Sequence, residues 1–160
     1  KKTLEAGLIR GRSIQGAAAA SLYIACQLCG VPRTLDEVAQ KLKLGRKEIG
    51  RTFRTIKREL KMKPMTTKPE QYIDRFCSDL QLRSEVVAQC HKWMEEIKRL
   101  ELDSGRGPVG IAASLIYMAS IVTGQNRTQR EIADITNVTE VTIRNRYKEL
   151  AVALGVELDI

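Results

Sequence analysis

One stretch near the end of the chain carries side chains that could read DNA bases. Within residues 140–154, suitable side chains recur at spacings of three and four residues, which places them on one face of a helix. They are Val141, Arg144, Asn145 and Lys148. Arginine and asparagine can hydrogen bond to base edges in the major groove, and valine can pack on a thymine methyl group. The spacing therefore predicts a base-reading helix.

A second stretch, residues 46–60, is rich in cationic side chains. These are Arg46, Lys47, Arg51, Arg54, Lys57 and Arg58. Such side chains contact phosphate oxygens, which position a protein on DNA without reading its sequence. The pattern therefore favours a phosphate-binding surface over a base-reading one. A solvated helix face that binds nothing is an alternative that the pattern leaves open.

The cysteines and the single histidine indicate neither a metal centre nor a catalytic one. Cys26 and Cys29 form a C-x-x-C pair, but no second pair follows, and structural zinc needs four ligands. The pair lies in an apolar helical run, so we expect small buried core residues there. The chain also lacks a glycine-rich phosphate loop and a nucleophile arrangement. We therefore expect no metal, no catalytic residue and no enzyme activity.

Each candidate surface belongs to a predicted helix-turn-helix. In residues 128–154, Ala133 is small enough for two helices to cross, and Asn137 tolerates the left-handed backbone of a turn. The apolar side chains expected to close the small core are Ile132, Val138 and Ile143. In the first half, residues 34–42 and 46–60 match this pattern, with a turn at Leu44 and Gly45. The motif is also a packing solution that can bind protein, and that alternative stays open.

The two motifs are parts of an internal repeat. Shifting the sequence by 94 residues aligns it with itself at 13 identities in 46 positions without a gap. Strand signals are absent, so we expect an all-α fold of two tandem five-helix repeats. The first repeat covers residues 1–63 and is incomplete at its N-terminus, a linker covers 64–68, and the second repeat covers 69–160.

The helices of each repeat follow from capping and breaking residues. In the first repeat we expect helices at 13–29, 34–42 and 46–60, preceded by the tail of another helix at 1–6. The helix at 13–29 is apolar nearly all round, so we expect it to be buried. In the second repeat we expect helices at 69–80, 83–102, 108–123, 128–135 and 140–154.

Positive charge is concentrated in the first repeat. The 160 residues carry a net charge of +8, but residues 1–63 hold 15 basic and 5 acidic side chains, whereas residues 64–160 hold 12 and 14. A basic half favours a polyanionic partner, most often nucleic acid. No apolar run reaches the roughly 18 residues of a membrane span, so we expect no membrane partner.

The sequence resembles the core domain of archaeal transcription initiation factor B, which is similar to eukaryotic general transcription factor IIB. The resemblance covers nearly all 160 residues. It is carried by Gly11-Arg-Ser13, Val31-Pro-Arg-Thr34, Lys47-Glu-Ile-Gly-Arg51, Arg127-Thr-Gln-Arg-Glu131 and Val138-Thr-Glu-Val-Thr-Ile-Arg144. It implies two cyclin-like repeats of five helices each, in agreement with the repeat found above.

The resemblance also implies a mechanism and a set of DNA contacts. Such proteins clamp the TATA-binding protein on bent promoter DNA. Val141 and Arg144 are implied to read the factor-B recognition element upstream of the TATA box. We expect Asn145 and Lys148 beside them on the same helix, and Arg106 as a phosphate contact. The residues implied to face DNA downstream of the TATA box, or the TATA-binding protein, are Gly11, Arg12, Arg46, Lys47, Arg54 and Arg58, to which the basic pattern adds Arg51.

The implied partners are the TATA-binding protein, promoter DNA and RNA polymerase, without a small-molecule substrate. We expect no cofactor in this chain, since the zinc of such factors belongs to an N-terminal ribbon missing from the fragment. The location would be the cytoplasm of an archaeon or the nucleus of a eukaryote. We expect the incomplete first repeat to expose apolar side chains such as Leu22 and Leu28.

Two alternatives remain at this point. A kinase-regulating cyclin shares the fold and would be a protein-interaction module, but it would need neither two helix-turn-helix surfaces nor a basic half. A factor-IIB-like subunit of the RNA polymerase III machinery is not wholly excluded by the motifs. A zinc-ribbon motif upstream in the full-length gene would favour factor B over the cyclin.

Overall fold

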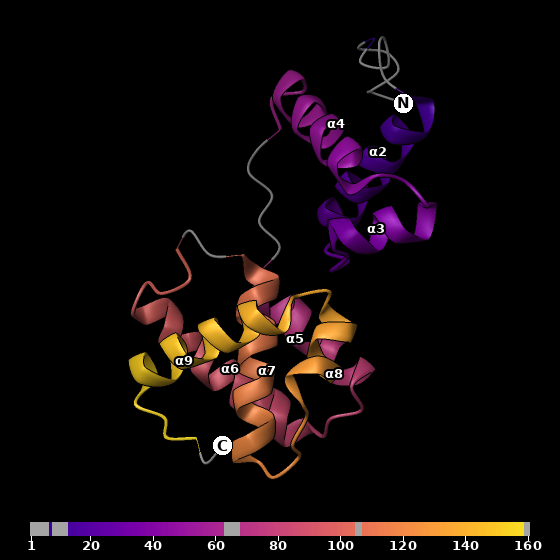
Figure 1. Cartoon of the computed structure of the whole chain (residues 1–160). Coiled ribbons are helices and arrows are strands. Elements are labelled where there is room, and N and C mark those ends of the chain that lie inside the picture. Colours follow the sequence, from indigo (N-terminus) through magenta and orange to yellow (C-terminus); the bar gives the residue numbers. More distant parts are fainter. Residues whose placement is uncertain (1–6, 8–12, 63–67, 105–106, 159–160) are drawn as a thin grey trace. The chain divides into compact units, whose positions relative to one another are not determined.

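The chain divides into two compact units, Lys1–Thr67 (unit 1) and Lys68–Ile160 (unit 2). The computed structural model describes residues 7, 13–62, 68–104 and 107–158. These residues form eight helices and no strand, which confirms the predicted all-α class (Figure 1). The helix tail predicted at residues 1–6 lies outside the described residues.

Unit 2 is built around one central helix. Its helices are α5 (Pro69–Asp79), α6 (Ser84–Arg99), α7 (Pro108–Val122), α8 (Gln129–Thr136) and α9 (Glu140–Leu154). Every residue of α7 from Ile111 to Ser120 is buried, because this helix packs against each of the other four (Figure 1). A helix that is apolar all round needs such a cover on all its sides.

Unit 1 has a smaller described core. Its helices are α2 (Ile14–Leu28), α3 (Leu35–Leu42) and α4 (Arg46–Glu59), and α2 packs against the other two. One face of α2 is buried, but Ile14, Leu22 and Leu28 are 75%, 49% and 63% exposed. The prediction that this helix is buried all round is therefore wrong for one face, whereas Leu22 and Leu28 are exposed as expected. The described part of unit 1 gives α2 two helical neighbours, whereas α7 has four.

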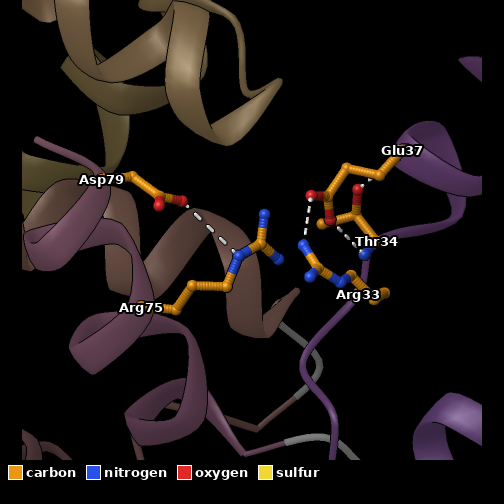
Figure 2. Close-up of polar contacts among 5 residues, drawn as sticks. All are labelled: Arg33, Thr34, Glu37, Arg75 and Asp79. Atoms are coloured by element: carbon orange, nitrogen blue, oxygen red, sulfur yellow. Dashed lines mark hydrogen bonds and ion pairs between the residues drawn. The ribbon is translucent and has the colours of Figure 1, made fainter. Parts of the chain in front are cut away.

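Side-chain caps define where the shorter helices begin. Thr34 and Thr128 each form a capping box with a glutamate three residues later. Figure 2 shows the Glu37 carboxylate accepting from the Thr34 amide at 2.7 Å and lying 3.6 Å from the Arg33 guanidinium. On α5, the Arg75 side chain turns toward Asp79 in a local ion pair of 3.5 Å (Figure 2).

The turn inside each helix-turn-helix is made by a residue with positive φ. Asn137 has φ 55° at the end of α8, which confirms the prediction for the second repeat. In unit 1 the left-handed residue is Lys43, with φ 52°, and not Gly45, whose φ is −67°. The prediction placed the turn too late, because Gly45 already serves as the N-cap of α4.

The cysteines are arranged differently from the prediction. Cys26 is half-buried and Cys29 is exposed, so the expectation that both are buried core residues is wrong. Cys29 is the C-cap of α2, where the chain has already left the packed face. The buried thiols are Cys77 and Cys90, and a hydrogen bond between the two, which favours the protonated form of Cys90, together with burial raises the pKa of the Cys90 thiol.

The described part of the chain offers neither a metal-binding cluster nor a membrane span. Its histidine, cysteine and acidic side chains nowhere gather in a group of three or more that could hold a metal ion. None of its helices is both long and apolar enough to cross a membrane.

Two glycines at matching repeat positions provide a test of this packing. A Cβ on Gly16 would lie 2.8 Å from both Ser13 Oγ and Glu48 Oε1, whereas a Cβ on Gly110 would meet nothing closer than Thr142 at 3.9 Å. Alanine is favoured over glycine in a helix by roughly 1 kcal/mol, and losing a serine cap costs about 1 kcal/mol. We expect Gly110→Ala to stabilise unit 2 and Gly16→Ala to give unit 1 no gain.

Native-state hydrogen exchange of the amides in α2 and α7 measures both units separately in one experiment. We expect the two substitutions to differ by about 1 kcal/mol in their effect on unfolding free energy. An equal gain at both positions would show that Ser13 and Glu48 move aside without cost.

Candidate nucleic-acid interface

The predicted base-reading side chains form one exposed stripe on α9. Val141 is 60% exposed, and Arg144, Asn145 and Lys148 are exposed as well. The opposite face of the helix is buried through Ile143, Tyr147, Leu150 and Ala151. Packing of the fold therefore buries none of the four predicted side chains. We call this set the α9 stripe.

The position of α9 is set by its contacts with α7 and α8. Ile132 and Ile143 are fully buried, and Val138 packs partly buried against the same core. The rings of Tyr117 and Tyr147 lie 4.8 Å apart between their centroids, which ties the middle of α9 to α7. The predicted side chains thus form the core of the helix-turn-helix, and the motif packs against α7.

The start of α9 is fixed by its own cap. Thr139 is the N-cap, and its side chain accepts a hydrogen bond from the Thr142 amide at 3.2 Å. The first turn of the helix, which includes Val141, is therefore ordered without any help from a partner. In recognition helices of this motif, residues near the N-terminus contact the base edges.

The guanidinium of Arg144 has a partner on the neighbouring helix. Its Nε donates to Gln129 Oε1 at 3.3 Å, and Gln129 Nε2 donates to the Tyr117 hydroxyl at 3.3 Å. Neither Gln129 nor Tyr117 was among the site residues predicted from the sequence. Their contact depends on how α7, α8 and α9 cross, so the only local signal was the place of Gln129 directly after the cap of α8.

The second capping box fixes the backbone at Gln129, the first residue of α8. The amide of Thr128 donates to Glu131 Oε2 at 2.7 Å, and the amide of Glu131 donates to Thr128 Oγ1 at 3.1 Å. The hydrogen bond from the Thr128 backbone lowers the pKa of the Glu131 carboxyl below its ordinary value of 4.5. Glu131 is therefore a carboxylate at neutral pH, and it keeps the first turn of α8 in place.

The basic helix α4 presents a second exposed stripe. Lys47, Arg51, Arg54 and Arg58 are exposed at helical spacings that put them on one face. The buried residues of the helix are Ile49, Gly50, Thr52 and Ile56. Lys57 departs from the stripe, since its Nζ lies 5.9 Å from the centre of the Phe53 ring. We call the four exposed cations the α4 stripe.

A hollow of about 600 Å³ lies beside the α4 stripe. It is lined by Ser13, Glu48, Arg51, Thr52, Arg54, Thr55 and Arg58. Ser13 donates a hydrogen bond to Glu48 Oε1, which holds that carboxylate at the wall. Three guanidinium groups against one carboxylate leave the hollow positively charged. Neither Ser13 nor Glu48 was among the site residues predicted from the sequence.

The structure separates Arg46 from the other predicted phosphate contacts. Its Nε lies 2.6 Å from Asp36 Oδ1 on α3, and it does not share the face of the α4 stripe. Arg58 is paired with Glu59 at 2.9 Å. Exposed ion pairs of this kind contribute little to stability, so the Arg58 guanidinium can readily leave Glu59 for a phosphate. Gly11, Arg12 and Arg106 lie outside the described residues.

A family model and several known proteins match nearly the whole chain. The family model of the transcription factor TFIIB repeat matches residues 1–59 and again residues 62–153. The chain is 56% identical over 158 residues to the transcription initiation factor IIB of Methanosarcina mazei and to that of Archaeoglobus fulgidus. It is 53% identical over 157 residues to that of Methanococcus maripaludis.

These matches cover 98–99% of this chain and 46–48% of the relatives. The chain therefore spans about half the length of the curated relatives that it matches.

Proposed function

Because the chain belongs to the transcription factor TFIIB family, we propose that it is the DNA-binding core of a general transcription initiation factor. In this proposal it binds promoter DNA together with the TATA-binding protein and reads a DNA element upstream of the TATA box. The observation that supports it best is the α9 stripe, which is exposed, rigidly capped and chemically suited to base edges. The chain acts by binding and not as an enzyme.

The α9 stripe divides into base-reading and phosphate-binding parts. Arg144 would present two donors to O6 and N7 of a guanine, and Val141 would pack against a thymine methyl group. Asn145 is suited to an adenine edge, and Lys148, further along the helix, to a phosphate. Arg106 is proposed as a further phosphate contact near this site.

The α4 stripe serves DNA without reading its sequence. Its four cations and the positively charged hollow suit phosphate oxygens or an acidic face of the TATA-binding protein. Gly11 and Arg12 are proposed to lie near DNA downstream of the TATA box. Arg46 would contribute less than the stripe, because it lies on a different face of α4.

RNA polymerase is the further partner proposed for the whole factor. The reported relatives are named transcription initiation factors, so they give no support to a kinase-regulating cyclin or to a subunit of the RNA polymerase III machinery. The archaeal origin of these relatives favours an archaeal promoter as the target.

The proposed function is tested by a gel shift with TATA-box DNA in the presence and absence of the TATA-binding protein. Each stripe offers few base-reading groups, so we expect tight binding only when the TATA-binding protein is present. Equal affinity with and without that protein would contradict the proposal.

Replacing Arg144 by alanine should remove sequence preference. A bidentate contact to guanine is worth about 1–3 kcal/mol of discrimination, which corresponds to roughly 5- to 150-fold in affinity ratio. The measurement compares the upstream element with a scrambled one at fixed salt, with the TATA-binding protein present. Val141→Ala should lower the ratio less, since only an apolar contact is lost.

Lys148→Ala is the control for this experiment, because a phosphate contact weakens binding to both DNAs alike. If Arg144→Ala keeps the wild-type ratio, α9 is not the reading helix.

Salt dependence tests the α4 stripe. Each phosphate contact contributes about 0.9 to the slope of log affinity against log salt concentration, so the double variant Lys47→Ala with Arg54→Ala should flatten the slope by about 2. Arg46→Ala is the matched control on the same helix, with an expected change well under 0.9 because Arg46 does not share the face of the α4 stripe. An unchanged slope in the double variant would show that the stripe does not meet phosphates.

A further inference from the structure

Gln129 lies between Tyr117 and Arg144, and the proposed function gives it no role. The three side chains come from three consecutive helices, α7, α8 and α9, which meet in unit 2. Two hydrogen bonds of 3.3 Å connect them, from Arg144 Nε to Gln129 Oε1 and from Gln129 Nε2 to the Tyr117 hydroxyl.

The donors and acceptors allow only one arrangement of the hydrogen bonds that run from Arg144 through Gln129 to Tyr117. A guanidinium can only donate, so the oxygen of the Gln129 amide has to face Arg144. The amide nitrogen then faces Tyr117, whose hydroxyl accepts. A reversed amide would place two donors against each other at Arg144. The identity of Arg144 therefore fixes the orientation of the Gln129 side chain.

Both ends of Gln129 are anchored. Tyr117 is 6% exposed, and its ring packs against Tyr147, so its hydroxyl occupies a fixed point. The backbone of Gln129 is the first residue of α8, directly after the capping box of Thr128 and Glu131. Gln129 itself is half-buried, which limits the competition of water for its amide.

The contact engages only one of the three guanidinium nitrogens of Arg144. Nε donates to Gln129, the residue as a whole is exposed, and this contact does not occupy the two terminal nitrogens. These two form the parallel pair of donors that O6 and N7 of a guanine accept. A flexible arginine would lose side-chain freedom on binding, whereas one held at Nε has lost part of it already.

We propose that Gln129 is a specificity-determining positioning residue, which holds the Arg144 guanidinium ready to read a guanine and is itself held by the Tyr117 hydroxyl. This inference rests on the proposed function, because it requires Arg144 to contact a base. Gln129 acts through Arg144 and needs no contact with DNA.

The test compares affinity for the upstream element with affinity for a scrambled element, at fixed salt with the TATA-binding protein present. We expect Gln129→Ala to lower this ratio about 3- to 10-fold, since it removes a hydrogen bond to a charged group, and Tyr117→Phe to lower it about 2-fold, since it removes a neutral hydrogen bond one step further away. Gln89→Ala, a half-buried glutamine on α6, is the matched control and should keep the ratio. Thermal unfolding of each variant shows that unit 2 remains folded.

A double variant separates positioning from direct contact. In an Arg144→Ala background, Gln129→Ala should change the ratio no further, because its effect passes through the missing guanidinium. A further loss in that background would show that Gln129 contacts DNA itself, which overturns the inference. An unchanged ratio in Gln129→Ala beside a collapsed ratio in Arg144→Ala would overturn the inference and leave the proposed function standing.

An unchanged ratio in Arg144→Ala would overturn the proposed function and this inference together. A measurement without DNA completes the test. The Nε–H proton of Arg144 should be protected from exchange in NMR spectra of the free protein. That protection should fall in Gln129→Ala and, to a smaller extent, in Tyr117→Phe, but not in Gln89→Ala. Equal protection in all four proteins would show that the contact does not hold Arg144.

Discussion

The burial of α7 is the constraint on which unit 2 depends. A helix whose residues from Ile111 to Ser120 are all buried has to be covered on every side, and α5, α6, α8 and α9 provide that cover. Because α9 covers α7 with one face, the opposite face is left exposed. The α9 stripe is the direct consequence, since its four side chains occupy the face that packing does not use.

The two units use the same helix-turn-helix plan for different chemistry. In unit 2 the exposed side of the second helix carries an arginine, an asparagine and a valine, which suit base edges. In unit 1 the corresponding helix carries four cations beside a positively charged hollow, which suit phosphates. A factor with both surfaces can gain affinity from one and sequence preference from the other.

Polar contacts under each stripe restrict the side chains that would meet DNA. Gln129 and Tyr117 hold one nitrogen of Arg144, while Ser13 holds the carboxylate of Glu48 at the wall of the hollow. Asp36 draws Arg46 away from the α4 stripe. These contacts determine which hydrogen-bond donors of the two stripes remain available to a partner. The charge of the residues alone would not show this.

The sequence by itself determined the features that depend on residues close together in the chain. The exposure of the α9 stripe follows from spacings of three and four residues, and the helix boundaries and the left-handed Asn137 follow from local cap and turn residues. The match of the sequence with itself at a shift of 94 residues determined the repeat as well. The tertiary structure alone decided contacts between distant residues. Gln129 meets Arg144 and Tyr117, and Arg46 meets Asp36, because such contacts depend on how the helices cross, which no local pattern encodes.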